Sequence, residues 1–498
     1  MNLVRIDGDN LTLEEVEAVA LRGARVRIHP KAVSKVKKCR KFVERIVDAE
    51  QTVYGINTGF GSLCRKKISK RDIEKLQENL VVSHALSVGP VFCEEEVRAI
   101  MLLRANVLAK GFSGVRLEVV QTLVEMINKR VHPVIPEKGS VGASGDLAPL
   151  AFMTLPIMGK GWAMYQGRLM DGKRAFKKAG ISPLKLSAKE GLALINGTCV
   201  MTAIGVLSLL KAERLAELAD IAGAMSMEAA LCTPAAFDPN IQKVRKHKGQ
   251  KKSAENLVKL TRGSQIREFH KACPKVQDPY SFRCMPQVHG AVRDALSYVR
   301  SVLEIEINSA TDNPLIFPDQ NKVISAGNFH GEPVALALDF LGISVSELAS
   351  ISERRMAALM NPVISDLPVF LTKEPGLNSG FMMAQTVAAS LVSENKCLTH
   401  PASVDSIPTS NNQEDHGSMG TIAARKAREV TVNTEDVLAI EFLAASQGLD
   451  FRSPLKPGIG TNRINRKIRR TIPPMVKDRS LVLDLVKMKE LMRRELVS

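Results

Sequence analysis

Five long segments with helical periodicity are the feature that most constrains the fold of this chain. They span residues 200–231, 287–309, 333–360, 380–398 and 421–446. Apolar residues return in them every three or four positions, which is typical of the buried face of a helix. Segments of about thirty residues exceed the usual globular helix and favour a bundle of parallel and antiparallel rods. Because strand-like alternation is scarce, the sequence predicts a mainly α fold.

The N-terminal third of the chain has a different character. It mixes short amphipathic stretches with loops rich in Gly, Pro and Asn, and the most unusual loops cover residues 54–63 and 136–149. We therefore predict two domains: a mixed helix and loop domain over residues 1–195, which contains the chemistry candidates, and a long central helical bundle with C-terminal helices over residues 196–498. Helices such as the one through residues 335–341 are apolar over much of their circumference, so we expect burial against sister subunits.

Composition excludes several classes of protein. In 498 residues, hydrophobic side chains make up 45% and charged ones 24%, which excludes a disordered, collagen-like or disulfide-scaffold chain. The first twenty residues are acidic, so we expect no secretory signal, and we expect no membrane span because the uncharged stretch 375–393 is too polar. Eight cysteines without a Cys-x-x-Cys pair suggest reduced thiols and a cytoplasmic protein.

The net charge of +17 favours anionic partners but does not choose among nucleic acid, anionic lipid and a carboxylate substrate. The basic run at residues 243–252 has no interleaved aromatic residues, so we interpret it as a solvated loop and expect no nucleic acid partner. The nine histidines include no His-x-x-x-His pair and no Cys-His spacing suited to zinc. We therefore expect no metal in catalysis.

The loop at residues 139–149 is the strongest candidate for chemistry. It places three glycines at three-residue spacing around Ala143 and Ser144, followed by Asp146. Glycine tolerates positive φ and close approach of neighbouring atoms, so the Gly145 nitrogen could fold back toward the Ala143 carbonyl carbon and close a five-membered ring. A helix entry capped by Ser144 or Asp146 explains the same residues equally well. A phosphate-binding loop is disfavoured because no Lys-Ser/Thr follows the glycines.

Residues 142–146 (GASGD) closely resemble the signature of the histidine and phenylalanine ammonia-lyase family. The resemblance extends over nearly the whole chain through motifs at residues 54–61 (YGINTGFG), 83–84 (SH), 104–106 (RAN), 196–198 (NGT), 277–283 (QDPYSFR), 311–314 (TDNP), 327–330 (GNFH) and 412–416 (NQEDH). It implies that Ala143, Ser144 and Gly145 cyclise and lose water to form an electrophilic methylidene-imidazolone (MIO), with no external cofactor. It also implies a largely helical homotetramer whose active sites draw residues from three subunits.

Deamination of an amino acid needs an electrophile, a base for the β-proton and an anchor for the carboxylate. The resemblance implies that Tyr54 is the base. Arg283 offers a planar, permanently charged fork that matches a carboxylate, and the resemblance puts it in the active site with Gln277 and Tyr280. By the same resemblance, Asn196 adds polar contacts near the prosthetic group and Phe329 packs beside it.

Two further residues bear on the choice of substrate. In histidine-specific members of the family, residues matching His84 and Glu414 bind the substrate's imidazole, whose two nitrogens need a donor and an acceptor. A carboxylate would be buried without a partner against a phenyl ring. The chain departs from the pattern of histidine-specific members at Phe152, Cys199 and Gly417. None of these changes removes a catalytic group, and Cys199 leaves the shape of the pocket open.

The resemblance thus implies a homotetramer that deaminates L-histidine non-oxidatively to trans-urocanate and ammonia, the first step of histidine degradation. Two alternatives stay open at this point. One is an ammonia-lyase or aminomutase for tyrosine or phenylalanine, which Glu414 disfavours. The other is a helical binding protein that keeps the scaffold without catalysis and holds nucleic acid through its positive charge.

Overall fold

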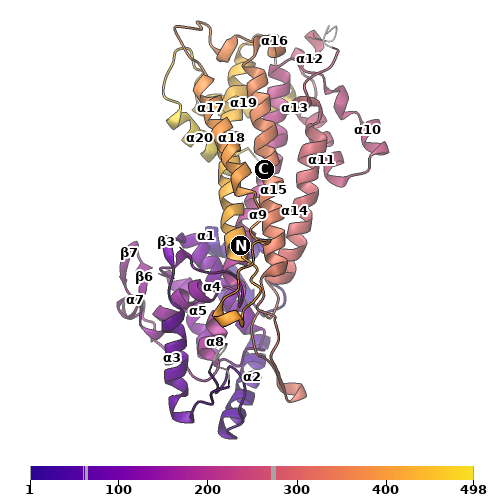
Figure 1. Ribbon diagram of the computed structural model, residues 1–498. Helices are drawn as coiled ribbons and strands as arrows, with labels where there is room; N and C mark the ends of the chain where they lie inside the picture. Colours follow the sequence, from indigo (N-terminus) through magenta and orange to yellow (C-terminus); the bar gives the residue numbers. More distant parts are fainter. Residues whose placement is uncertain (1, 60, 62–64, 271–275, 497–498) are drawn as a thin grey trace. The chain divides into compact units, whose positions relative to one another are not determined.

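The computed structural model describes residues 2–59, 61, 65–270 and 276–496 (Figure 1). Helices dominate these residues, and the mainly α fold predicted from the sequence is confirmed. The α-helices are α1 (Leu13–Arg22), α2 (Pro30–Asp48), α3 (Ile73–His84), α4 (Glu94–Ala109), α5 (Leu117–Lys129), α6 (Leu147–Thr154), α7 (Gly172–Ala179), α8 (Glu190–Ile195), α9 (Cys199–Ala229), α10 (Pro239–Val244), α11 (Lys248–Thr261), α12 (Gln265–Phe269), α13 (Tyr280–Arg283), α14 (Met285–Glu306), α15 (Glu332–Leu359), α16 (Pro362–Ser365), α17 (Met382–Leu398), α18 (Gly420–Asp450), α19 (Ile459–Thr471) and α20 (Val482–Arg494).

The five long helices predicted from periodicity correspond to α9, α14, α15, α17 and α18, and their ends agree to within four residues. Helix ends follow local chemistry. Helix α1, for example, begins at a capping box between Thr12 and Glu15 and ends at Gly23 in the left-handed conformation. The basic run at 243–252 was expected to be a loop, and this is wrong in part because α11 begins at Lys248.

The strands are short and lie in small separate sheets. They are β1 (Leu3–Ile6), β2 (Arg25–Ile28), β3 (Val88–Val91), β4 (Val131–Pro133), β5 (Pro136–Lys138), β6 (Trp162–Tyr165), β7 (Arg168–Asp171), β8 (Leu315–Phe317) and β9 (Lys322–Ile324). Strands β1 and β2 pair in parallel, whereas β3 with β5, β4 with β6 and β7, and β8 with β9 pair antiparallel. Strand β5 leads directly into the glycine loop.

The chain divides into two compact units. Unit 1 comprises residues 1–207, 300–339 and 401–425, and unit 2 comprises residues 208–299, 340–400 and 426–498. All the strands given above belong to unit 1. Four boundaries between the units fall inside α9, α14, α15 and α18, and the fifth, at residues 400/401, follows the end of α17. The division predicted at residue 195 stays a prediction. Unit 1 also contains the later segments 300–339 and 401–425, which a single division of the chain could not assign to it.

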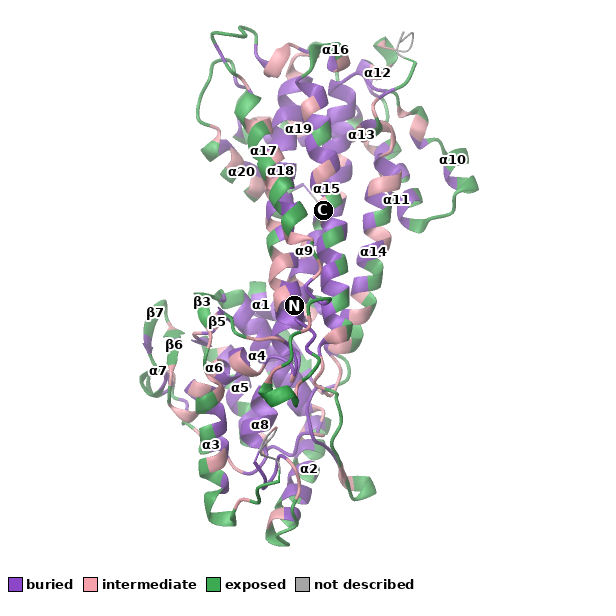
Figure 2. Cartoon of the chain, viewed as in Figure 1, coloured by how far each residue is buried: buried purple, intermediate pink, exposed green. Residues whose placement is uncertain are grey.

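Unit 2 is built on the long helices. Glu441 of α18 accepts hydrogen bonds from Ser226 of α9 (2.8 Å) and from Ser352 of α15 (2.6 Å), and it forms a fully buried ion pair with Arg355 of α15 (2.5 Å). These contacts place α9, α15 and α18 against one another. Figure 2 shows α9, α15 and α18 largely buried, whereas α10 and α17 are mainly exposed. Many alanines lie among the buried Leu, Val and Met residues of these helices, which suits close helix packing.

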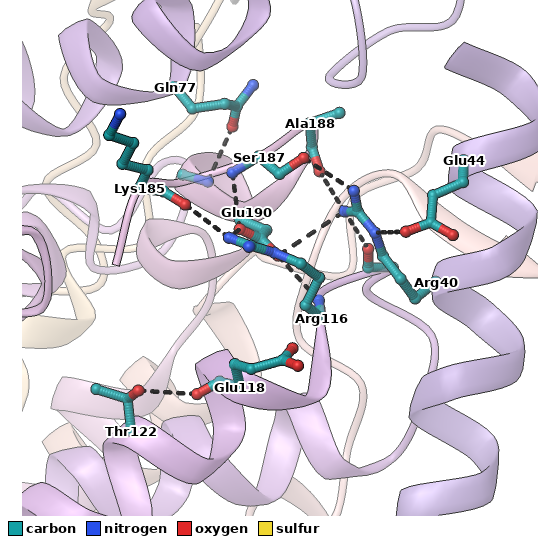
Figure 3. A network of polar contacts seen from close by, with 12 residues as sticks. Arg40, Glu44, Gln77, Arg116, Glu118, Thr122, Lys185, Ser187, Ala188 and Glu190 are labelled. Atoms are coloured by element: carbon teal, nitrogen blue, oxygen red, sulfur yellow. Dashed lines mark hydrogen bonds and ion pairs between the residues drawn. The ribbon is translucent and has the colours of Figure 1, made fainter. Parts of the chain in front are cut away.

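A buried network of charges fixes the start of α8 in unit 1. Glu190 is fully buried and accepts hydrogen bonds from the Arg116 guanidinium at 2.8 and 2.7 Å. Figure 3 shows Arg40 approaching the same carboxylate from the other side, at 3.8 Å. Gln77 of α3 accepts from the backbone N–H of Gly191 at 2.8 Å. Because the predicted site residue Asn196 directly follows α8, this network positions one wall of the site.

Helix α15 is long and apolar enough to cross a membrane by length and composition, with a mean hydropathy of 1.7 over its most apolar stretch. The sequence analysis did not anticipate this helix as a candidate span. Of that stretch, 67% is buried within the described chain. Core helices of globular proteins pass the same test, and the burial of α15 favours that interpretation.

Candidate active site

A cavity of about 1060 Å³ in unit 1 contains most of the predicted site. Its wall comes from segments that are far apart in the chain: Thr52, Tyr54, Thr58, Gly59, Gly61, Leu76, Asn79, Leu80, Ser83, His84, Ser144, Leu147, Leu192, Asn196, Asn313, Ser325, Ala326, Phe329, Ser410, Gln413 and Glu414. Six of them were predicted from the sequence as site residues, namely Tyr54, His84, Ser144, Asn196, Phe329 and Glu414. The tertiary structure therefore brings together residues from six of the family motifs and the glycine loop.

Ala143 and Ser144 occupy a tight turn between two glycines. Gly142 and Gly145 pair with each other and have φ values of 70° and 71°, in the left-handed region. A Cβ atom on Gly145 would overlap the carbonyl oxygen of Gly197. Both the backbone conformation and the lack of space require glycine at this position. The loop is therefore shaped for close backbone approach, as a ring closure between residues 143 and 145 requires.

Asp146 follows this turn and occupies the N-cap position of α6, but its side chain does not cap that helix. Instead its carboxylate accepts hydrogen bonds from the backbone N–H groups of Val200 (2.8 Å) and Met201 (3.0 Å), and from the hydroxyl of Thr421 (2.6 Å). Burial raises the pKa of the Asp146 carboxyl to about 6, although these hydrogen bonds act in the opposite direction. The helix-entry interpretation is thus correct for the backbone, while the side chain ties the loop to α9.

Tyr54 projects from a compact turn that its own segment holds together. Asn57 accepts from the backbone N–H of Val53 at 2.9 Å and donates to the carbonyl of Gln51 at 2.8 Å. Gly55 has a φ of 76°, and a Cβ there would lie 2.8 Å from the side chain of Leu192. The Tyr54 hydroxyl accepts from the backbone N–H of Gly61 at 3.4 Å. Phe60, Ser62 and Leu63 of the predicted loop lie outside the described residues.

His84 is the last residue of α3 and lines the cavity. Its Nδ1 lies 2.8 Å from the carbonyl oxygen of Leu80. Because a carbonyl only accepts, this nitrogen must carry the proton, which leaves Nε2 of the neutral ring as an acceptor. Leu76, Asn79 and Leu80 line the same cavity from α3. These three residues were not predicted from the sequence, although steps of three or four residues connect Leu76 to Asn79, Leu76 to Leu80 and Leu80 to His84, as on one helix face.

Glu414 has hydrogen bonds to both carboxylate oxygens. Ser144 donates to Oε1 at 2.6 Å, and the hydroxyls of Thr409 and Ser410 donate to Oε2 at 3.0 Å each. Residues 410–412 all have φ between 51° and 61°. Two of these three are asparagine, a residue that tolerates the left-handed region better than most. This turn presents the carboxylate to the cavity.

Asn196 and the buried Arg104 link α8 to the glycine loop. The Arg104 guanidinium donates to the Asn196 carbonyl at 2.7 Å, and the Asn196 side-chain amide donates to the Ser144 carbonyl at 3.4 Å. Cys199 lies next to them, with its Sγ 3.9 Å from the same guanidinium. Burial raises the pKa of the Cys199 thiol to about 11. Cys199, Phe152 and Gly417 are not part of the cavity wall.

Gln277, Tyr280 and Arg283 belong to unit 2 and are not part of this cavity wall. Tyr280 and Arg283 lie against each other: the guanidinium carbon of Arg283 lies 4.5 Å from the centre of the Tyr280 ring. Tyr280 is 71% exposed and Gln277 is also exposed. Tyr280 and Arg283 therefore lie together on α13, and Gln277 lies in the segment before it.

One group of side chains near the cavity has the composition of a metal site. The ligand atoms of His330, Glu332 and His416 lie within 4.8 Å of one another. His330 follows the wall residue Phe329, and His416 lies two residues after Glu414. Asn313, from the motif at 311–314, also lines the cavity and accepts from the backbone N–H of Ala326 at 2.8 Å.

The fold and this site define a helical lyase with a glycine-shaped reactive loop, and the sequence matches the aromatic amino acid lyase family over residues 11–470. The chain belongs to this family. It is 58% identical over 485 residues to a histidine ammonia-lyase of Caldanaerobacter subterraneus subsp. tengcongensis, covering 97% of this chain and 95% of the relative. Among solved structures it is similar to a histidine ammonia-lyase from Trypanosoma cruzi, with a TM-score of 0.92, 44% identity, and coverage of 99% of this chain and 93% of that one.

A tyrosine aminomutase from Streptomyces globisporus has a TM-score of 0.93 to this chain with 38% identity, covering 99% of this chain and 97% of its own. The scaffold is therefore shared by relatives with different named activities. Fold similarity alone does not separate these activities, so the substrate has to be argued from the residues of the cavity.

Proposed function

We propose that this protein is a histidine ammonia-lyase, which converts L-histidine to trans-urocanate and ammonia without oxidation. The observation that carries the proposal is the carboxylate of Glu414 in the cavity wall, in direct hydrogen-bond contact with Ser144 and in the same cavity as His84. A phenyl ring offers this carboxylate no hydrogen-bond donor, whereas an imidazole N–H does. The names of the relatives that are about half or more identical over the whole chain agree with this choice.

The family uses an MIO group, and we propose that Ala143, Ser144 and Gly145 form it in this chain. The residues fit the group: Gly142 and Gly145 pair with each other and hold a tight left-handed turn around Ala143 and Ser144, and Gly197 leaves no room for a side chain at Gly145. Ser144 supplies the hydroxyl that is lost as water. The group would supply an electrophilic carbon that makes the substrate's amine a better leaving group.

The chain's own residues have to handle one proton. When the bond between Cα and the amine breaks, a double bond forms only if a proton leaves the β-carbon of the substrate. We assign Tyr54 as the base that accepts this proton, because its phenol lies in the cavity wall on a loop held by Asn57. Phe329 holds the reacting end of the substrate in place. Asn196 does so indirectly, because its amide donates a hydrogen bond to the Ser144 carbonyl.

Gln277, Tyr280 and Arg283 enter the site from a neighbouring subunit in this proposal. They lie in unit 2, where Arg283 packs on the ring of Tyr280 and both Gln277 and Tyr280 are exposed, so this segment is accessible to another chain. Arg283 supplies the carboxylate anchor. Exposed apolar side chains on the long helices, such as Phe340 and Ile343 on α15, favour burial in a homotetramer. We place the tetramer in the cytoplasm, with no external cofactor and no nucleic acid partner.

The test is to offer the purified protein L-histidine, L-tyrosine and L-phenylalanine separately and to identify the products. We expect trans-urocanate from histidine and far slower turnover of the other two. Cinnamate or coumarate in place of urocanate would support a lyase for phenylalanine or tyrosine, and a β-amino acid would support an aminomutase. If none of the three is turned over and the protein binds nucleic acid in a salt-dependent way, the scaffold serves binding and not catalysis. Gel filtration with activity assays tests the tetramer, since a fully active monomer would contradict shared sites.

A further inference from the structure

We propose that His330 is a positioning residue that holds Glu414 in place by hydrogen bonding to the backbone of the segment that carries Glu414. The proposal rests on the proposed function, because it gives Glu414 the task of binding the substrate ring. Nothing in the sequence analysis assigned His330 a partner.

The contact joins two segments of unit 1 that both line the cavity. The Nε2 atom of His330 lies 3.1 Å from the carbonyl oxygen of His416, and the two imidazole rings stack with centres 5.7 Å apart and planes 3° from parallel. Phe329 precedes His330, and Glu414 lies two residues before His416. A tie between residues 330 and 416 therefore fixes the distance between two walls of the cavity.

Both nitrogens of His330 have backbone partners, which determines the state of the ring. A carbonyl only accepts, so Nε2 must donate to His416. The other nitrogen, Nδ1, lies 3.3 Å from the backbone nitrogen of Glu332 at the start of α15, and a backbone N–H only donates. His330 is thus a neutral ring with its proton on Nε2, and α15 holds that ring in place.

The segment around Glu414 is tied down on both sides, and His330 supplies the tie between them. Before Glu414, Thr409 and Ser410 donate to its carboxylate. After it, Gly417 donates to Ser406 at 2.8 Å and Met419 donates to the carbonyl of Val141 in the glycine loop at 2.9 Å. In the described part of the chain, His330 is the side chain that bonds to the backbone of residues 415–416. Without it, the stretch that follows Glu414 is anchored only from Gly417 onward.

The same three side chains could alternatively bind a metal ion. Glu332 Oε2 is buried without a hydrogen-bond partner and lies 3.8 Å from His416 Nε2. However, His330 would have to give up one of its two backbone hydrogen bonds to become the third ligand. Because the observed hydrogen bond of His330 is to the backbone carbonyl of residue 416 and the two rings only stack, the geometry favours a clamp.

Two substitutions of His330 separate these contacts. A glutamine amide reaches about as far as Nε2, so His330→Gln can still donate to the His416 carbonyl. An asparagine amide ends near the position of Nδ1, so His330→Asn can accept from Glu332 but cannot reach His416. The third variant, His416→Ala, removes the imidazole ring and keeps the carbonyl.

Hydrogen exchange of the peptide covering residues 405–420 tests the clamp whatever the substrate is. We expect faster exchange in His330→Asn than in wild type, and near wild-type exchange in His330→Gln and His416→Ala. For L-histidine we expect His330→Asn to raise KM about 3- to 10-fold, the range for loss of one hydrogen bond, with kcat and the ultraviolet absorbance of the MIO group nearly unchanged.

Three results would overturn the proposal. The first is a His330→Asn variant with the exchange rate and KM of wild type. The second is an equal effect of His330→Gln and His330→Asn on exchange and KM. The third is a rise in KM in His416→Ala as large as in His330→Asn, together with loss of a bound zinc ion. If histidine is not turned over at all but exchange still separates the two His330 variants, the proposed function fails and the clamp stands.

Discussion

The hydroxyl of Ser144 donates a hydrogen bond of 2.6 Å to the carboxylate of Glu414, although the two residues are 270 positions apart in the chain. Ser144 lies in the turn before α6, and Glu414 follows the left-handed turn at residues 410–412. The residue that would become the electrophile is thus in contact with the residue proposed to bind the substrate ring. This contact leads to predictions for both side chains.

Replacing the serine should abolish activity. Ser144→Ala has no hydroxyl to lose as water, so no MIO group forms, and we expect kcat to fall by more than about 10³-fold, a barrier increase of more than about 4 kcal/mol. The ultraviolet absorbance of the MIO group should vanish while the helical circular dichroism stays. Ser182→Ala, at an exposed serine, is the matched control. Full activity in Ser144→Ala would show that Ser144 is not the source of the electrophile.

Glu414→Gln should weaken the recognition of histidine. The amide keeps the size of the side chain but removes its charge, and hydrogen bonds to charged groups contribute about 1.5–3 kcal/mol. We therefore expect kcat/KM for L-histidine to fall about 10- to 150-fold. Thr409→Val, which removes one hydrogen bond to Glu414, should have a smaller effect of the same kind. Unchanged kinetics in Glu414→Gln would remove the reason for choosing histidine over phenylalanine.

Tyr54→Phe removes the proposed base without changing the shape of the ring. General base catalysis contributes about 10²- to 10⁴-fold, so kcat should fall by that factor while KM changes little. The MIO absorbance should persist, which separates this variant from Ser144→Ala. Tyr165→Phe, in β6 and outside the cavity wall, should retain wild-type turnover. A wild-type kcat in Tyr54→Phe would assign the proton to another group.

Asp146 should make the stability of the protein depend on pH. Its pKa is about 6 in the folded chain against 3.8 ordinarily, so between these values the folded chain holds a proton that the unfolded chain has released. Asp146 therefore adds to the free energy of unfolding below about pH 4. This contribution of roughly 3 kcal/mol is lost as the pH rises through 6.

Asp146→Asn should remove this dependence. Its carbonyl can accept from Val200 and Met201, while its amide donates to Thr421. Urea unfolding of both proteins at pH 4.5 and pH 7 measures the difference, and the wild type should lose more stability over this interval than the variant. Equal losses would mean that Asp146 titrates at its ordinary pKa.

Lys189 and Asp312 form a fully buried ion pair at 2.8 Å beneath the cavity wall residue Asn313. Removing one partner leaves an unpaired buried charge, so Lys189→Met should lower the free energy of unfolding by about 3–5 kcal/mol. Lys185→Met, four residues earlier on an exposed side chain, should change it by less than about 0.5 kcal/mol. Denaturant unfolding measures the stability of both variants. A Lys189→Met variant as stable as wild type would contradict the expected cost of an unpaired buried charge.

Local patterns in the sequence were enough for the helices and for the individual motifs. The length and periodicity of α9, α14, α15, α17 and α18 follow from apolar side chains that have to face a core, and this information is contained in neighbouring residues. The glycines around Ser144 likewise indicate, from neighbouring residues alone, that the backbone adopts the left-handed conformation there. The roles of Tyr54, His84 and Glu414 were implied by the family resemblance. The structure places these three residues in the wall of one cavity, and their roles stay predictions.

Contacts between distant segments could be decided only by the tertiary structure. The hydrogen bond between Ser144 and Glu414, the use of Asp146 to bind the start of α9, and the tie from His330 to the backbone of residue 416 depend on where the chain brings separate loops together. Leu76 and Asn79 were assigned to the cavity wall from the tertiary structure, in which α3 and the glycine loop line the same cavity. Periodicity reports which face of a helix is buried, but it does not report what that face is buried against.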